Sequence, residues 1–106
     1  MGNKLISMQR GGWTYVVTNK PRGVLYIGVT ADLAARILQH KDGRGAAFCR
    51  RYNLTQLVHV EPHPTIEDAI AREKALKAWK REWKIALIEG ANPQWDDLSS
   101  YLAEAS

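Results

Sequence analysis

The sequence has little cysteine, no long apolar run and few acidic residues in its first half. Cys49 is the single cysteine among 106 residues. An internal disulfide is therefore excluded, and a reducing, cytoplasmic location is expected. No apolar run approaches the roughly 20 residues of a membrane-spanning helix, and the segment MGNKLISMQRGG lacks the apolar core of a signal peptide. The sequence therefore predicts a protein without a membrane partner.

Acidic residues are scarce before residue 61. Residues 1–60 contain nine lysines and arginines but only two acidic residues, whereas residues 61–106 contain six basic and nine acidic residues. An excess of positive charge in one half of the chain favours contact with a polyanion, and nucleic acid is the first candidate. A solvated basic surface would explain the same charges. The basic candidates for substrate binding are Lys20, Arg22, Arg44, Arg50, Arg51 and Lys77.

Two runs rich in β-branched and aromatic residues flank a turn-like segment near the N-terminus. WTYVVTN and VLYIGV are typical of strands. KPRG predicts the turn between them, because proline fixes one φ and glycine tolerates a positive φ. If Asn19 pairs with Arg22, Tyr15 lies directly opposite Tyr26. A slip of one residue would put the two rings on opposite faces of the sheet.

The rest of the chain alternates helix, strand and helix signals. Helices are predicted over ADLAARILQHK, from Ile66 to about Glu89, and over QWDDLSSYLAEA. The second is longer than a small core needs, which leaves a break or bend within it open. LTQLVHVEPH predicts a third strand, stopped by its prolines, and DGRGAAFCRRYN predicts a basic loop.

The predicted order of elements is β-β-α-β-α-α. This order predicts an α+β fold, with a small three-stranded antiparallel sheet flanked by helices. The chain length suits a single domain. We expect a flexible tail over residues 1–12 and the folded domain over residues 13–106.

The predicted long helix has a carboxylate beside its apolar stripe. At 100° per residue, Ile66, Ala69 and Leu76 lie within about 60° of Glu73. A charge in that position costs desolvation energy unless a cation or several donors meet it. An i, i+4 ion pair with Lys77 would provide the cation, and so would a metal ion bound in a cleft. The pattern alone leaves both interpretations open.

The first predicted helix carries Arg36 and His40 along one edge of its apolar stripe. In one interpretation they border the stripe, and the arginine stem covers apolar surface. In the other they form a phosphate clamp. The guanidinium fork binds phosphate oxygens, and the histidine exchanges a proton or binds a nucleophilic water. His59 and His63 do not predict a zinc site, because Pro62 lies between them and no further ligands are evident.

Together these residues resemble the GIY-YIG nuclease superfamily. The second family motif is intact in VLYIGV, and the first keeps only the tyrosine of WTY. Ten residues separate Tyr15 from Tyr26, Arg36 lies ten positions after Tyr26, and His40 follows four later. This spacing is similar to that of the family. AREKALKAWKREWKIALIE resembles the family's metal-binding helix, with Glu73 as its carboxylate.

The C-terminal part extends the resemblance, which covers about residues 13–98. NPQWDDL is similar to the same segment in small stand-alone bacterial members, often labelled excinuclease C-like, and it matches Asn92 to a family asparagine. The resemblance implies a divalent-metal-dependent endonuclease that cleaves DNA, in repair or recombination. Asn92 then joins the candidates for substrate binding.

The resemblance also implies a role for each site residue. Glu73 would hold one Mg²⁺ or Mn²⁺, Arg36 would neutralise charge on the phosphate, and Tyr15 would donate a hydrogen bond. Tyr26 would orient or deprotonate the water. A phenol with an ordinary pKa of about 10 is a weak base at neutral pH, so His40 is the rival base.

Two other functions remain open on the sequence alone. A non-catalytic DNA-binding module of the same fold predicts salt-sensitive binding without turnover. A nuclease directed at RNA would use the same chemistry. The oligomeric state, monomer or weak homodimer, is also open.

Overall fold

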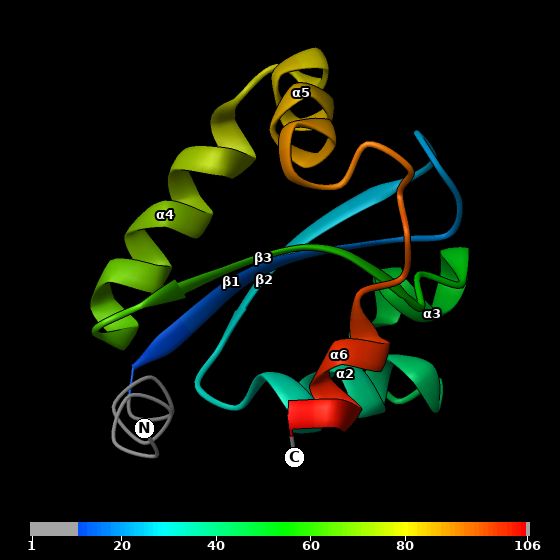
Figure 1. Ribbon diagram of the computed structural model, residues 1–106, viewed down its shortest axis with the longest axis horizontal. Helices are drawn as coiled ribbons and strands as arrows, with labels where there is room; N and C mark the ends of the chain where they lie inside the picture. Colours follow the sequence, from blue (N-terminus) through cyan, green and yellow to red (C-terminus); the bar gives the residue numbers. More distant parts are fainter. Residues whose placement is uncertain (1–10, 106) are drawn as a thin grey trace.

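The computed structural model describes the backbone of residues 11–105 and the side chains of residues 11–102. Three strands form one antiparallel sheet in the order β2-β1-β3 (Figure 1). They are β1 (Gly12–Thr18), β2 (Leu25–Thr30) and β3 (Gln56–His63). The predicted sheet is confirmed. Of the predicted tail, residues 1–10 lie outside the described residues, and Gly12 already belongs to β1.

Helices cover both faces of the sheet (Figure 1). One face carries α4 (Ile66–Ala78) and α5 (Arg81–Ala91). The other carries α2 (Leu33–Lys41), α3 (Ala47–Tyr52) and α6 (Ser99–Ala105). This arrangement confirms the α+β class. Within the described residues, no helix is long and apolar enough to cross a membrane.

Two segments differ in detail from the prediction. The segment predicted as a basic loop contains α3, so the observed order has one more helix between β2 and β3. A six-residue helix is too short to be stable through propensity alone. It is held because Cys49 is buried in the core and Asn53 ends it in the left-handed conformation at φ 58°.

The predicted long helix is two helices. Trp79 and Lys80 have extended backbones, with ψ of 153° and 149°, and these values end the helical ladder between α4 and α5. The break that the length of the segment left open therefore falls at these two residues.

The strand register differs from the expected one by two residues. Tyr15 lies opposite Gly28, and Tyr26 lies opposite Val17. The direct pairing of the two tyrosines is therefore wrong. Because side chains alternate with a period of two, a shift of two residues still leaves both rings on the same face of the sheet.

The turn explains this register. Gly23 N–H donates to Lys20 O at 2.9 Å, and Arg22 adopts a positive φ of 56°. Val24 N–H donates to the Asn19 side chain at 3.0 Å. The connection is therefore longer than expected, and the strands pair from Thr18 outward.

Two apolar cores follow from the alternation of strand side chains. The core under α2, α3 and α6 contains Tyr15, Val17, Leu33, Ile37, Cys49, Leu54 and Leu57. The core under α4 and α5 contains Val16, Ile27, Val58, Leu76, Ile88 and Trp95. Consecutive residues of β1 thus serve opposite cores, and β1 is fixed in the centre of the sheet.

Candidate active site

A pocket of about 320 Å³ opens between the sheet and α2. Four residues of the predicted site line it, namely Tyr15 from β1, Tyr26 from β2, and Arg36 and His40 from α2. The wall is completed by Gln39, Arg44, Gly45 and Ala46. The structure therefore brings together four of the five predicted catalytic side chains.

The two family motifs interlock at one glycine. Tyr15 is fully buried, and its ring lies directly over Gly28. A Cβ atom added to Gly28 would lie 2.4 Å from both Cζ and Oη of Tyr15, closer than any stable contact. The glycine after the second tyrosine therefore makes room for the first tyrosine, and this contact sets the position of the Tyr15 hydroxyl.

His40 is held between Tyr15 and the loop that follows α2. Its Nε2 lies 3.1 Å from Tyr15 Oη, and the two rings meet edge to face with centroids 5.7 Å apart. Only 3% of His40 is exposed. A Cβ atom on Gly45 would lie 2.7 Å from His40 Nδ1, so glycine is needed there for the loop to cover the ring. Among the described residues, Nδ1 has no hydrogen-bond partner.

Burial favours the neutral forms of Tyr15 and His40. It raises the pKa of Tyr15 to about 12, although the nearby Arg36 guanidinium acts in the opposite direction. Burial and the charge of Arg36 both lower the pKa of His40 below its ordinary 6.5. At neutral pH, Tyr15 is therefore a neutral phenol and His40 a neutral imidazole that can accept a proton.

Arg36 places an uncompensated positive charge in the pocket. Its side chain is half-buried, and it forms no ion pair with any carboxylate in the part of the chain that the structure describes. Asp32 caps the N-terminus of the helix that carries Arg36, and its side chain accepts a hydrogen bond from Ala35 N–H at 3.1 Å. A partly desolvated guanidinium without a carboxylate is suited to a phosphate.

Glu73 lies on α4, across the sheet from α2, and does not line the pocket. Its Oε2 forms the predicted i, i+4 ion pair with Lys77 Nζ at 3.0 Å, and 16% of its side chain is exposed. Lys77 Nζ also lies 6.0 Å from the centre of the Tyr26 ring. Glu73 is thus linked to the pocket through Lys77 and edge strand β2.

The donor set at Glu73 suits an open metal site. The described residues hold no group of three or more histidine, cysteine or acidic side chains that could bind a metal ion. Mg²⁺ is commonly held by one or two carboxylates together with waters and substrate phosphates. The single Glu73 carboxylate fits such a site, provided that Lys77 moves to the phosphate.

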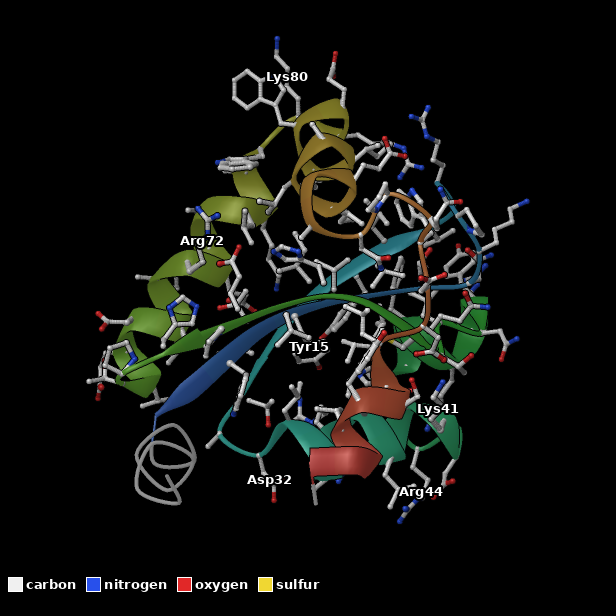
Figure 2. All side chains as sticks on the ribbon, in the orientation of Figure 1. Tyr15, Asp32, Lys41, Arg44, Arg72 and Lys80 are labelled. Carbon is white, nitrogen blue, oxygen red and sulfur yellow. The ribbon has the colours of Figure 1, made fainter. Side chains whose placement is uncertain are left out.

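Three predicted substrate-binding residues lie on the pocket side of the molecule. Arg44 lines the pocket and pairs with Asp42 at 2.8 Å. Arg50 and Arg51 are exposed on α3. Figure 2 shows Tyr15 between the sheet and the α2 layer, with Arg44 beyond the end of α2.

The hairpin candidates lie elsewhere. Lys20 and Arg22 are exposed in the turn between β1 and β2. The Arg22 guanidinium is engaged by Glu89 of α5 through two hydrogen bonds of 2.9 and 3.0 Å. Neither Lys20 nor Arg22 lines the pocket.

Asn92 is buried, with 5% exposure, and does not line the pocket. Its side-chain NH₂ donates to Val58 O at 3.1 Å and to Asp96 O at 2.9 Å. Its side-chain oxygen accepts from Asp96 N–H at 3.0 Å. These bonds attach the segment after α5 to β3, so the geometry supports a structural role.

Sequence reasoning did not identify Gln39, Gly45 or Phe48. Phe48 stacks on Tyr26, with ring centroids 6.3 Å apart and an angle of 30° between the planes. The signal for Phe48 was a lone phenylalanine among arginines in DGRGAAFCRRYN. No sequence signal marked Gly45, because its role depends on how the loop folds over His40.

The chain matches a known protein family over most of its length. The GIY-YIG catalytic domain family matches residues 11–86. The chain belongs to this family, whose catalytic domain indicates a nuclease.

The related proteins define a narrower group. UPF0213 proteins resemble this chain over most of their own length. That of Staphylococcus saprophyticus is 36% identical over 76 residues, covering 72% of this chain and 92% of the relative. That of Pseudomonas aeruginosa is 33% identical over 78 residues, covering 74% of this chain and 75% of the relative. That of Haloquadratum walsbyi is 40% identical over 65 residues, covering 61% of this chain and 73% of the relative. No solved structure gives a significant match.

Proposed function

We propose that this protein is a divalent-metal-dependent endonuclease that hydrolyses phosphodiester bonds in DNA, in repair or recombination. One observation carries the proposal. Tyr15, Tyr26, Arg36 and His40 come from two strands and a helix, and all four line one pocket. Phosphodiester hydrolysis needs a positioned water, a base and neutralisation of charge on the phosphoryl oxygens, and these side chains would supply all three.

Arg36 would bind the phosphate and stabilise the charge that develops on its oxygens. The guanidinium has no carboxylate partner to displace among the described side chains. Preorganised donors of this kind are worth about 10²–10³ in rate where they meet developing charge. Lys77, displaced from Glu73, would add a second cation beside Tyr26.

The neutral side chains of the pocket would orient and deprotonate the attacking water. Tyr26 is half-buried at the pocket wall, where its hydroxyl would orient the attacking water. His40 is neutral because its pKa is lowered, so it would accept the proton of that water. Tyr15, 3.1 Å from His40 Nε2, would hold the imidazole in place. The proposal thus assigns the base to His40 and the orienting role to Tyr26.

Glu73 would hold the single Mg²⁺ or Mn²⁺. A bound ion supplies Lewis-acid polarisation of the phosphate and stabilises the leaving oxygen. For this chain, the requirement is that Lys77 exchange its carboxylate partner for a phosphate oxygen.

The test is nicking of supercoiled plasmid, and cleavage of labelled single-stranded, duplex and branched DNA, with Mg²⁺, Mn²⁺ or a chelator. Glu73→Gln keeps the size of the side chain and removes its charge, and we expect it to abolish cleavage. Glu67→Gln is the matched control, because Glu67 is an exposed acid on the same helix. Wild type that stays inert on every DNA with both metals would refute the activity. Unchanged cleavage by Glu73→Gln would refute the metal assignment.

The second candidate is a non-catalytic DNA-binding module. The Glu73–Lys77 ion pair favours it, because the proposed metal ligand already has a cation at 3.0 Å. This module would bind DNA in a salt-dependent way and show no turnover with either metal. Matched RNA substrates in the same assay test the remaining alternative, an RNA-directed nuclease.

A further inference from the structure

Three aromatic rings extend outward from the pocket along α3. Tyr26 lines the pocket and stacks on Phe48. Phe48 in turn meets Tyr52, with ring centroids 4.9 Å apart. The Arg51 guanidinium lies 5.5 Å from the centre of the Tyr52 ring. We call Tyr26, Phe48 and Tyr52 the aromatic ladder.

Packing of the core does not explain why Phe48 and Tyr52 are exposed. Phe48 is 45% exposed and Tyr52 is 39% exposed. On the same short helix, Cys49 is the side chain that is buried in the core, with 3% exposure. The smaller thiol therefore anchors α3, and the larger apolar ring faces solvent. Exposed aromatic side chains beside a functional pocket mark an interaction surface.

The charges around the ladder select the kind of partner. Arg50 and Arg51 lie in the last turn of α3, which contains no acidic residue. Arg44 lines the adjoining pocket, and Lys77 Nζ lies 6.0 Å from the centre of the Tyr26 ring. Rings interleaved with cations suit a polyanion that also carries flat apolar groups. A nucleic-acid strand has both, with its phosphates and its bases.

The bases must be unpaired to use this surface. In a duplex, the base faces are stacked on one another and are not available to a protein ring. On an aromatic platform, each stacked base contributes about 1–3 kcal/mol, with little dependence on sequence. Phe48 stacks on Tyr26, which lines the pocket, so a base stacked on Phe48 would belong to a nucleotide close to the phosphate at Arg36.

We infer that the aromatic ladder stacks unpaired bases next to the scissile phosphate, and that the substrate is single-stranded DNA. The position of the phosphate rests on the function proposed above. The stacking surface itself rests on exposure, ring geometry and charge. Binding measured without a divalent metal therefore tests the ladder separately from turnover.

The experiment is fluorescence anisotropy in EDTA with three labelled probes of equal length, at constant salt. They are single-stranded oligothymidylate, an abasic strand with the same phosphates, and a blunt duplex. Phe48→Leu removes the ring and keeps an apolar side chain. Trp83→Leu is the matched control, because Trp83 is 54% exposed on α5, across the sheet.

We expect wild type to prefer oligothymidylate over both other probes. Phe48→Leu should weaken that binding about ten-fold, as the loss of one stacked base predicts. It should leave binding of the abasic strand unchanged, and Phe48→Trp should restore the affinity for bases. Trp83→Leu should bind like wild type. Thermal melting of each variant shows whether the fold is retained.

Three results would overturn the inference. They are equal affinity of wild type for duplex and single strand, equal weakening of the abasic and base-containing probes by Phe48→Leu, and tighter ring-dependent binding of oligouridylate than of oligothymidylate. The last result would assign the ladder to RNA. Ring-dependent binding of oligothymidylate without cleavage in Mg²⁺ or Mn²⁺ would instead refute the proposed catalysis and support the ladder.

Discussion

The molecule contains two polar clusters built from similar residues, one on each side of the sheet. The first is the pocket, with Arg36, His40 and the two tyrosines. The second, which we call the Glu61 cluster, joins β1, β3 and α4. It consists of Thr14, His59, Glu61, His63 and Arg72. Figure 2 shows Arg72 on α4, on the side of the sheet away from the α2 layer that covers Tyr15.

The Glu61 cluster is internally paired. Arg72 donates to both oxygens of Glu61, at 2.7 and 3.1 Å. His59 Nε2 lies 2.8 Å from the same carboxylate, and His63 Nε2 lies 3.0 Å from the Thr14 hydroxyl. A half-buried network with its polar groups paired holds β3 against α4 and leaves little for a ligand to bind.

The pocket, in contrast to the Glu61 cluster, contains polar groups that lack partners among the described residues. Arg36 has no carboxylate partner, and His40 Nδ1 has no hydrogen-bond partner, in the part of the chain that the structure describes. Burial raises the pKa of Tyr15, and burial together with the charge of Arg36 lowers the pKa of His40, so both side chains are held in their neutral forms. Unmet polar groups with perturbed pKa values, gathered in a pocket, are the physical mark of a functional site. The comparison therefore predicts that mutations in the two clusters affect different properties.

Arg36→Ala should have the largest effect, and the effect should be on activity. Loss of a preorganised donor at developing charge lowers the rate by about 10²–10³. Stability should change little, because Arg36 forms no ion pair among residues 11–102. Plasmid nicking and urea unfolding of the same preparation measure both properties. A large loss of stability with normal nicking would show that Arg36 is a structural residue.

Gly28→Ala should damage both properties, because the pocket is also part of a core. The new Cβ would lie 2.4 Å from the Tyr15 ring, and Tyr15 is fully buried. Overpacking of this kind costs about 1–3 kcal/mol, and a displaced ring carries the hydroxyl away from His40. Thermal melting and nicking should therefore fall together. Gly90→Ala is the control, because a Cβ there would meet no atom within 4 Å. Unchanged melting of Gly28→Ala would contradict the interlock of the two motifs.

Arg72→Met should affect stability alone. It removes two hydrogen bonds to Glu61 and a guanidinium 5.1 Å from the Trp79 ring. Leaving a partly buried carboxylate short of partners costs about 1–3 kcal/mol. Urea unfolding followed by tryptophan fluorescence measures the change. DNA cleavage below the melting temperature should match wild type. A selective loss of cleavage would place the Glu61 cluster in the functional site.

The sequence predicted the pocket better than it predicted the surroundings of the pocket. Periodicity placed Arg36 and His40 along one edge of a helix, and the resemblance to the GIY-YIG family joined them with Tyr15 and Tyr26 in one site. The expected strand register was wrong by two residues, but a shift of two keeps Tyr15 and Tyr26 on the same face of the sheet. The Glu73–Lys77 ion pair was one of the two interpretations that the i, i+4 spacing left open, and the structure contains it.

The elements that the sequence missed depend on tertiary contacts. α3 is a single short helix whose stability comes from burying Cys49, and local propensity cannot show that. The Glu61 cluster joins His59 and Arg72 across a strand and a helix, so only the folded chain reveals the pairing. The burial of Asn92 likewise follows from bonds to β3, which a match to a family asparagine does not predict.

The smallest expected effect is a separation of the two clusters in their acid sensitivity. Burial and Arg36 lower the pKa of His40, so between that pKa and about 6.5 the unfolded chain binds more protons than the folded one. Stability contributed by neutral His40 is therefore complete above about pH 6.5 and declines as the pH falls below that value. Burial opposes the charge of Glu61, but hydrogen bonds from Arg72 and His59 outweigh it and lower the Glu61 pKa below 4.5.

The contribution of the Glu61 cluster should therefore persist to lower pH. It is complete above about pH 4.5 and is lost as the pH falls through the folded pKa. Urea unfolding across this range, compared with His40→Gln and Glu61→Gln, separates the two contributions. His40→Gln should flatten the decline that begins near pH 6.5 and leave the decline below pH 4.5. Glu61→Gln should do the reverse. If both variants flattened the same part of the curve, the two clusters would be coupled through the sheet, and the division between a binding cluster and a structural cluster would fail.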